Sequence, residues 1–242
     1  MSEQETPPAT TTFGRLKVSA RERKRRIRGV FTDIARRYDL MNDLMSLGIH
    51  RSWKRTVARH CRDFPGVAID LAGGTGDIAS LLRASGREVI VCDPSLAMMA
   101  IGRERRKGIL WSAAEAEHLP FADCSIDLLT ISFGLRNVTD MDQALREIHR
   151  VLKPGGHFVC LEFSHPRFWL APFYNLYSRF VIPTLGAAVA GQPEAYDYLI
   201  ESIRRFPDQK TLAGALSAAG FEAVHWRDLS FGIACIHFGK RP

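Results

Sequence analysis

The chain has 242 residues, of which 46% are hydrophobic and 24% charged, which suits a soluble protein long enough to bury one sizeable core. Its five cysteines are scattered without a short paired spacing, which argues against a disulfide framework or a zinc site, and we expect no metal. The N-terminus lacks the apolar core of a secretory signal, so we predict a cytoplasmic protein.

The net charge of +7 is concentrated at the N-terminal end. Residues 1–62 carry 15 Lys/Arg against 6 Asp/Glu, whereas the remainder has a net charge of −2. Such a basic end suits an acidic partner, either an anionic membrane surface or nucleic acid. The basic run has few aromatic residues and no recognisable motif, so we expect no nucleic-acid partner.

The first quarter of the chain is predicted to be an extension followed by cap helices. Residues 1–29 are interpreted as a disordered, basic extension, because residues 1–14 are rich in Thr, Pro and Glu and eight Lys/Arg follow between Arg15 and Arg28. Apolar residues then recur at steps of three and four from Ile27 to Met41, which predicts an amphipathic helix. Residues 30–62 are predicted to cap the cofactor with an adaptable apolar pocket; plain helical packing on the sheet is the alternative.

A buried strand, a glycine-rich turn and a helix follow one another from residue 67. Residues 67–71 are mostly aliphatic, Gly73, Gly74 and Gly76 form the turn, and apolar residues then recur at helical spacing. Glycines let a ligand approach the backbone closely, and the helix N-terminus offers free N–H groups. The turn is therefore predicted to bind a cofactor.

Two cofactor classes use such a turn. The Gly-x-Gly-x-x-Ala spacing from Gly74, with Asp93 after the strand at residues 88–92, fits a dinucleotide. Enzymes that use S-adenosylmethionine (SAM) add an acid on the first strand, here Asp70, and a polar-Ala pair for adenine, here Glu115-Ala116. Taken singly, Asp70 could cap the turn and Glu115 could be a surface acid. Because all of these features occur together and in this order, they favour a SAM-dependent enzyme. An NAD-dependent oxidoreductase is the alternative.

Strand and helix patterns alternate through the rest of the chain. Strands are predicted at residues 109–112, 126–132 and 157–163, with a helix at 141–152, and the last two strands, 221–226 and 232–239, are predicted to be antiparallel. We predict an α/β, Rossmann-like fold of the SAM-dependent methyltransferase type in one domain, residues 30–242. It has a seven-stranded, mostly parallel sheet with a reversed C-terminal edge strand and helices on both faces.

An aromatic-rich insertion interrupts this alternation at residues 165–207. Prolines and polar residues break its apolar stretch, so a transmembrane helix is not expected. Because it emerges at the carboxyl ends of the strands, it is interpreted as a substrate lid. An extra helical layer is an equal alternative.

The chain resembles the ubiquinone/menaquinone biosynthesis C-methyltransferases over roughly residues 30–239. The resemblance depends on motifs that stand in the family's order: Tyr-Asp-Leu-Met-Asn (38–42), Ser-Leu-Gly-Ile-His-Arg-Ser-Trp (46–53), Asp-Leu-Ala-Gly-Gly-Thr-Gly-Asp (70–77), Ser-Phe-Gly-Leu-Arg-Asn-Val (132–138), Arg-Val-Leu-Lys-Pro-Gly-Gly (150–156), Leu-Glu-Phe-Ser (161–164) and Phe-Pro-Asp-Gln (206–209). It implies that SAM contacts Thr75, Asp93, Glu115, Ala116 and Ser132. Many members carry Asn or Asp where this chain has Glu115.

The resemblance implies methyl transfer from SAM to a ring carbon of a polyprenylated benzoquinol, or of a naphthoquinol in the menaquinone branch. A noncatalytic SAM-binding component of a quinone-synthesis complex is a further alternative. Phenol carbons become nucleophilic when an adjacent hydroxyl is ionised, so a base is required. We assign Arg136 and Asn137 to stabilising the phenolate and positioning water, and Asp77 to orienting that water or Arg136. A salt bridge with a helix cap is the alternative for Arg136; His50 and His165 are candidate bases.

A polyprenyl tail lies in a bilayer, which gives a reason for a basic N-terminal face and an aromatic insertion. We therefore expect peripheral attachment to an anionic membrane at the cytoplasmic side. A homodimer and other quinone-biosynthesis enzymes are candidate partners.

Overall fold

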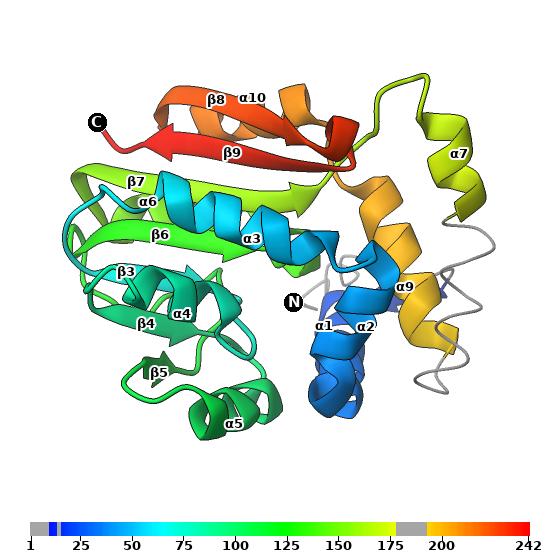
Figure 1. Ribbon diagram of the computed structural model, residues 1–242, viewed down its shortest axis with the longest axis horizontal. Coiled ribbons are helices and arrows are strands. Elements are labelled where there is room, and N and C mark those ends of the chain that lie inside the picture. The colour runs from blue at the N-terminus through cyan, green and yellow to red at the C-terminus, as the bar shows by residue number, and fades with distance from the viewer. Residues whose placement is uncertain (1–9, 14–15, 178–192) are drawn as a thin grey trace, which may run out of the picture.

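The computed structural model describes residues 10–13, 16–177 and 193–242, and a seven-stranded sheet lies at its centre (Figure 1). The strand order is β5-β4-β3-β6-β7-β9-β8. Strands β3 to β7 pair in parallel, whereas β9 is antiparallel to both of its neighbours. The strands are β3 (Ala68–Leu71), β4 (Val89–Cys92), β5 (Leu110–Ser112), β6 (Ile126–Ser132), β7 (Leu152–Phe163), β8 (Glu222–Leu229) and β9 (Ala234–Lys240). The predicted mixed sheet is confirmed, and the reversed strand belongs to the C-terminal edge hairpin.

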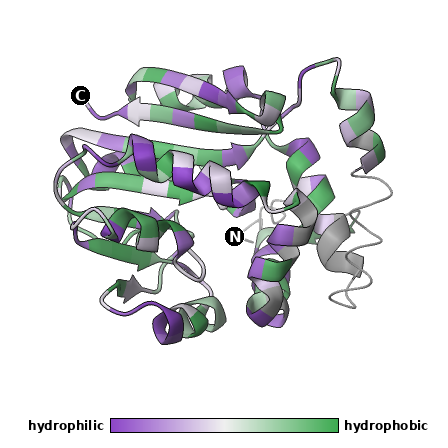
Figure 2. Cartoon of the chain, viewed as in Figure 1, coloured by the Kyte–Doolittle hydropathy of each residue, from purple (hydrophilic) through white to green (hydrophobic). Residues whose placement is uncertain are grey.

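Helices cover both faces of this sheet. Helices α3 (Ile49–His60) and α4 (Asp77–Arg83) lie on one face, and α6 (Met141–Val151) and α10 (Gln209–Ala218) pack on the other, while α5 (Leu96–Arg105) follows β4. The side chains of successive strand residues point to opposite faces of the sheet. Leu128 packs with α3 and α4, whereas Leu129 and Ile131 pack with α6 and α10. The central strands are therefore apolar on both sides (Figure 2).

The basic N-terminal segment is folded. Strands β1 (Thr10–Phe13) and β2 (Leu16–Ser19) form a hairpin, and α1 (Ala20–Ile34) begins where the Ser19 hydroxyl accepts a hydrogen bond from the Glu22 N–H. A short turn of 3₁₀ helix, η1 (Ala35–Arg37), leads into α2 (Tyr38–Ser46). The predicted disordered extension 1–29 is thus corrected for residues 10–13 and 16–29, which form β1, β2 and the start of α1. Phe13 and Ile27 are buried in one cluster with Tyr198 of α9 (Pro193–Arg205). Residues 1–9 lie outside the described part.

The predicted lid is described in two pieces. Helix α9 stands beside α1 and α2, and helix α7 (Ala171–Leu176) lies on the far side of α9 from α1, both beyond the carboxyl ends of the parallel strands (Figure 1). Residues 178–192 of the predicted insertion lie outside the described residues. A helix with both the length and the apolar character needed to cross a membrane is not found among the described residues.

Candidate functional site

Two cavities meet at the carboxyl edge of the sheet. The first, which we call the glycine-loop cavity, is about 110 Å³ and lies between α1 and the loops after β3, β4 and β5. The second, which we call the apolar cavity, is about 300 Å³ and lies between α2, α3, α7 and α9. Phe133 lines both cavities and separates them. A ligand in either cavity would therefore lie next to Phe133.

The glycine loop is shaped from inside the protein by Asp70. Gly74 and Gly76 have φ values of +56° and +81°, which favour glycine. A Cβ atom on Gly73 would lie 2.8 Å from the Asp70 Oδ2 atom, which accepts a hydrogen bond of 3.0 Å from the Ala79 N–H. Asp70 does not line either cavity within the described part of the chain. It caps the turn, which is the structural role that the sequence left open.

Burial raises the pKa of Asp70 to about 7, against the hydrogen bonds from the Ala79 N–H and the Thr130 hydroxyl, which lower it. The folded state therefore holds this proton more tightly than the unfolded chain does. Its contribution to stability is complete below pH ~4 and is lost as the pH rises to about 7, at ~1.4 kcal/mol per pH unit. Thermal unfolding of Asp70→Asn should lack this part of the pH dependence. A melting temperature that falls equally in both proteins between pH 5 and 8 would contradict the assignment.

Asp93 joins the end of β4 to the glycine loop. Its Oδ2 atom accepts a hydrogen bond of 2.9 Å from the Gly74 N–H, and its Oδ1 atom accepts one of 2.7 Å from the Ser95 N–H. Burial raises its pKa to about 6, against these two bonds, which lower it. Asp93 and Gly74 both line the glycine-loop cavity. Each carboxylate oxygen keeps a second lone pair, so Asp93 can also accept hydrogen bonds from ligand hydroxyls.

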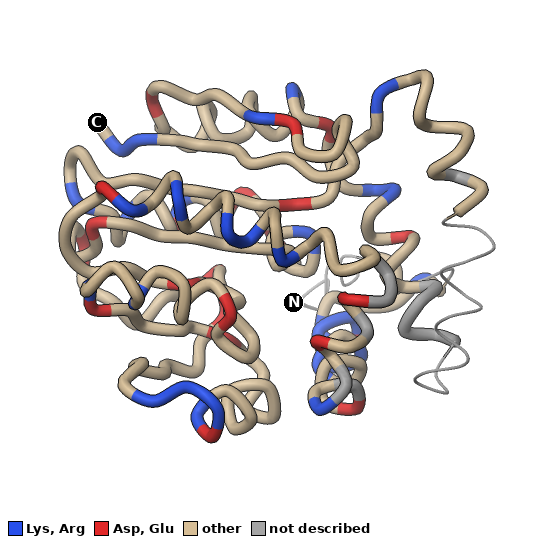
Figure 3. The backbone as a smooth tube through the Cα atoms, viewed as in Figure 1, with Lys and Arg blue, Asp and Glu red and all other residues tan. Residues whose placement is uncertain are grey.

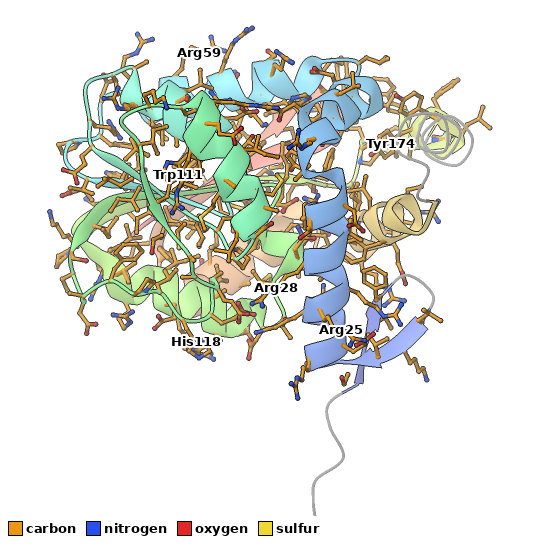
Figure 4. The ribbon with its side chains drawn as sticks, turned by 90° about the horizontal axis from the view of Figure 1, so that it is seen from below. Arg25, Arg28, Arg59, Trp111, His118 and Tyr174 are labelled. Atoms are coloured by element: carbon orange, nitrogen blue, oxygen red, sulfur yellow. The ribbon has the colours of Figure 1, made fainter. Side chains whose placement is uncertain are left out.

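Glu115 and Ala116 line the same cavity, and two basic residues of α1 contact Glu115. Its carboxylate pairs with the Lys24 ammonium at 2.6 Å and with the Arg28 guanidinium. The hydrogen bond from Lys24 holds the pKa of Glu115 below its usual value. Figure 4 shows Arg28 on the side of α1 that faces the body of the protein. Part of the basic charge along α1 (Figure 3) is thus neutralised within the chain.

Two further residues predicted to contact SAM lie behind the cavity wall. The Thr75 carbonyl accepts a hydrogen bond of 2.8 Å from Arg106 Nε, and its side chain is buried. The Ser132 Oγ atom is buried and has no hydrogen-bond partner in the described structure. Neither residue is among the described cavity-lining residues. The contacts of Thr75 and Ser132 with SAM therefore stay predictions.

Arg136 lines the apolar cavity and is almost fully buried. Its Nη1 atom donates to Glu162 Oε2 at 3.0 Å and to the Phe133 carbonyl at 2.6 Å, and the side chains of Arg136 and Glu162 are only 5% and 1% exposed. The Arg136 Nε atom is buried without a hydrogen-bond partner among the described residues. The salt bridge that the sequence left as an alternative is present. It leaves the Nε N–H without a hydrogen-bond partner among the described residues.

Asn137 lies on the other side of Phe133, where it lines the glycine-loop cavity. Its Oδ1 atom accepts a hydrogen bond of 2.8 Å from the Tyr198 hydroxyl on α9. The consecutive residues Arg136 and Asn137 therefore serve different cavities. The 3₁₀ turn η2 (Leu135–Asn137) produces this divergence, because successive side chains leave a 3₁₀ turn in different directions.

Asp77 is held away from Arg136. Its carboxylate accepts a hydrogen bond of 2.8 Å from Lys54 Nζ and pairs with the Arg106 guanidinium. Burial raises its pKa, but Lys54 and Arg106 outweigh burial and keep the pKa below its usual value. In the described structure Asp77 lines neither cavity. The expected contact between Asp77 and Arg136 is not present.

Two contributors to the site were missed by sequence reasoning. Phe133 has a φ of +57°, a region that non-glycine residues rarely adopt, and its ring packs 4.7 Å from that of Phe163. Lys24 reaches Glu115 across 91 positions of sequence. The Ser-Phe-Gly-Leu-Arg-Asn run was a signal for Phe133, whereas the Lys24 contact had none.

Of the two candidate histidines, His50 is buried and lines the apolar cavity. His165 is exposed and is absent from the described lining of either cavity. The structure therefore brings together His50, Arg136 and Phe133 at one cavity. Only His50 has the position expected of a base.

The family model described as "ubiE/COQ5 methyltransferase family" matches residues 18–241. The "Ubiquinone/menaquinone biosynthesis C-methyltransferase UbiE" of Rubrivivax gelatinosus is 61% identical, with 98% of this chain and 95% of that protein covered. The human "2-methoxy-6-polyprenyl-1,4-benzoquinol methylase, mitochondrial" is 42% identical, with 98% and 86% covered.

Among solved structures, a SAM-dependent methyltransferase from Thermotoga maritima, described as a possible histamine N-methyltransferase, superposes with a TM-score of 0.65 at 22% identity. The match covers 88% of this chain and 99% of that one, and it shows the same fold. The matches to the family model and to the relatives extend over nearly the whole chain. The chain belongs to the ubiE/COQ5 methyltransferase family.

Proposed function

We propose that the protein is a SAM-dependent C-methyltransferase that methylates the ring of a reduced, polyprenylated benzoquinol or of demethylmenaquinol. The observation that carries the proposal is the pair of cavities that meet at Phe133, one lined by carboxylates and the other by apolar side chains and a buried arginine. The relatives named as quinone-biosynthesis methyltransferases support the choice of substrate.

The residues of the glycine-loop cavity fit SAM. SAM supplies a methyl group on a positively charged sulfur that is already a good leaving group. Asp93 would accept hydrogen bonds from the ribose hydroxyls, and Gly74 lets the backbone approach them. Glu115 has enough lone pairs to accept from an adenine amino group while it keeps Lys24 and Arg28, with Ala116 beside the ring. Asp70, Thr75 and Ser132 would support the loop and wall from behind.

The residues of the apolar cavity fit a phenolate. The Arg136 guanidinium, which lines this cavity, would donate to the oxyanion that forms when the quinol hydroxyl loses its proton. Glu162 and the Phe133 carbonyl fix the guanidinium before substrate arrives, so little reorganisation is needed during the reaction. Apolar walls such as Trp53 and Phe163 exclude water, which strengthens the hydrogen bond.

Two residues named from the sequence would act at a distance. Asn137, fixed by Tyr198, would position water or the cofactor on its side of Phe133. Asp77 would act as a positioning residue, because it joins Lys54 on α3 to Arg106 beside the glycine loop. The α3 helix carries His50 and Trp53, which line the apolar cavity.

The proposal is tested by incubating the protein anaerobically with methyl-labelled SAM and either a demethylated prenyl benzoquinol or demethylmenaquinol. Mass spectrometry should locate one labelled methyl group on a ring carbon, and the preferred acceptor identifies the branch. A noncatalytic role predicts SAM binding without product. Tighter binding of NAD than of SAM in calorimetry would support the oxidoreductase alternative instead.

Peripheral membrane attachment is proposed from the mouth of the apolar cavity. Leu47, Phe173 and Tyr177 line this cavity, and the first two side chains are 74% and 70% exposed. Phe168 is 88% exposed, and Trp169 packs against the exposed ring of Phe231, with centroids 5.1 Å apart. An apolar rim around an apolar cavity suits a substrate whose tail stays in lipid. Assembly as a homodimer, or with other quinone-biosynthesis enzymes, stays a prediction.

Sedimentation with anionic vesicles should show binding at low salt that is weaker, but not lost, at high salt. The double substitution Phe168→Ser with Phe173→Ser should lower the bound fraction at least fivefold, because ~0.8 kcal/mol is lost for each CH₂ group that no longer enters the bilayer and each ring carries several carbons. Leu96→Ser removes a 68% exposed side chain on α5 and is the matched control. Equal binding by both variants, or no binding of the parent protein at low salt, would refute this attachment.

A further inference from the structure

We propose that His50 is the general base that removes the hydroxyl proton of the quinol, an inference that rests on the proposed methyltransferase function. His50 lies in the first turn of α3 and is only 4% exposed. It lines the apolar cavity together with Arg136 and Phe133. A base and an oxyanion donor are thus placed at the same cavity.

The hydrogen bonds around His50 fix which ring nitrogen carries the proton. The Ser46 Oγ atom lies 2.7 Å from the Asn42 carbonyl, which can only accept, so the single hydroxyl proton of Ser46 is donated there. Ser46 Oγ is also 2.9 Å from His50 Nδ1 and 3.3 Å from the His50 N–H. We assign Ser46 as the acceptor in both contacts, which places the ring proton of His50 on Nδ1. The Nε2 lone pair remains available as a proton acceptor.

The charges around His50 suit a base that is neutral before the reaction. Burial and the positive charge of Lys54 lower the pKa of His50, while Asp43, the Asn42 carbonyl and Asp77 raise it. The net effect keeps the pKa below its ordinary value, so the ring is neutral at pH 7. The other titratable groups at this cavity are Arg136, Tyr174 and Tyr177.

Asp43 is placed to stabilise His50 once it has accepted a proton. Its Oδ1 atom lies 3.7 Å from His50 Nε2, too far for a hydrogen bond but close enough for charge attraction. The two Asp43 oxygens accept hydrogen bonds of 2.6 and 2.5 Å from Arg51, which hold the pKa of Asp43 below its usual value. Asp43 is therefore a carboxylate throughout, and it favours the imidazolium that forms.

The protons that His50 and the quinol ring exchange during the reaction balance. His50 Nε2 takes the hydroxyl proton, which leaves a phenolate oxygen beside Arg136. The ring carbon forms the new C–C bond as the methyl–sulfur bond breaks, and the electron pair of that bond stays on sulfur. The oxygen is then a ketone, and loss of the ring carbon's own proton to solvent restores the aromatic ring and the phenolate oxygen. The imidazolium returns its proton to that oxygen. No oxidant, reductant or further reactant is needed.

Kinetics of His50→Asn and His50→Gln test the role. Asn keeps a donor near the Nδ1 position and Gln keeps an amide near Nε2, but neither accepts a proton. With a short-tailed, reduced benzoquinol we expect kcat to fall about 100-fold in both variants, while the SAM dissociation constant stays within threefold. His225→Asn, an exposed site on β8, is the control. Turnover within threefold of the parent protein in either variant would overturn the proposal.

The pH profile gives a readout that a structural role would not change. With SAM held at saturation over the whole pH range, so that protonation of Asp93 does not limit the rate, kcat/KM for the quinol should fall at acidic pH as His50 becomes protonated. This limb should be absent from the residual activity of His50→Asn. An unchanged limb in that variant would assign it to another group and overturn the proposal. Melting curves of the two His50 variants show whether a loss of activity comes from unfolding. If one variant is destabilised, the test depends on the other, which melts like the parent protein.

Nitrogen NMR on the protein without substrate tests the tautomer separately from activity. The His50 signal should show a protonated Nδ1 and an unprotonated Nε2 at pH 7. A protonated Nε2 would overturn the proposal even if methyl transfer is observed. An absence of methyl transfer in the parent protein, together with the expected tautomer, would instead refute the proposed function and leave only the neutral state of His50 established.

Discussion

Replacing Arg136 by lysine is expected to lower turnover about 100-fold, while the dissociation constant of SAM changes less than threefold. Lysine can still face Glu162, so no buried carboxylate is left unpaired. Its three N–H donors share a single nitrogen, so they cannot span the positions that the planar guanidinium occupies between Glu162, the Phe133 carbonyl and the substrate oxyanion. The loss of one fixed oxyanion donor typically costs 10²–10³ in rate.

A paired variant separates this role from a purely structural ion pair. Arg136→Met with Glu162→Gln removes both charges, so neither partner is left charged and buried. If the salt bridge serves the fold alone, this variant should turn over at nearly the rate of the parent protein. We expect it to melt within a few degrees of the parent protein and to have lost turnover. Arg55→Lys, exposed on α3, is the matched control for the single change.

Asp93→Asn is expected to weaken SAM binding about 30-fold in titration calorimetry. Both oxygens of Asp93 accept from backbone N–H groups, and the amide nitrogen of Asn would face one of those donors with hydrogens of its own. One charge-assisted hydrogen bond is then lost, worth ~1.5–3 kcal/mol, and the glycine loop is released from β4. In the parent protein, affinity should also weaken below pH about 6, where Asp93 takes up a proton.

Asp142→Asn, an exposed change in the first turn of α6, is the control for this measurement. It alters the net charge equally but lies outside the described cavity linings. SAM affinity that is unaltered in Asp93→Asn, or reduced as much in Asp142→Asn, would remove Asp93 from the cofactor site. Affinity independent of pH in the parent protein would mean that Asp93 stays charged throughout.

The regular elements were predictable because their signals are local. Strand β6 was predicted at residues 126–132 and occupies Ile126–Ser132, and α6 ends one residue earlier than predicted. Continuous apolar runs and helical spacing determine such elements. Strand β7 differs, because it begins at Leu152, whereas the strand was predicted only from residue 157 and residue 152 was predicted to end a helix. Its pairing with β6 skips from Leu152 to His157, so the Pro-Gly-Gly segment is accommodated as an irregularity inside the strand.

The sequence by itself determined the sheet, the glycine loop and the family, since each is written in adjacent residues and their periods. Only the tertiary structure decided which candidates line a cavity: Asp93 and Glu115 do, whereas Asp70 and Asp77 are held behind the site. It also placed Lys24 on Glu115, and Phe133 between the cavities. These contacts join segments that are distant along the chain. They form only when the ends of the strands and the covering helices meet, so no local pattern could have revealed them.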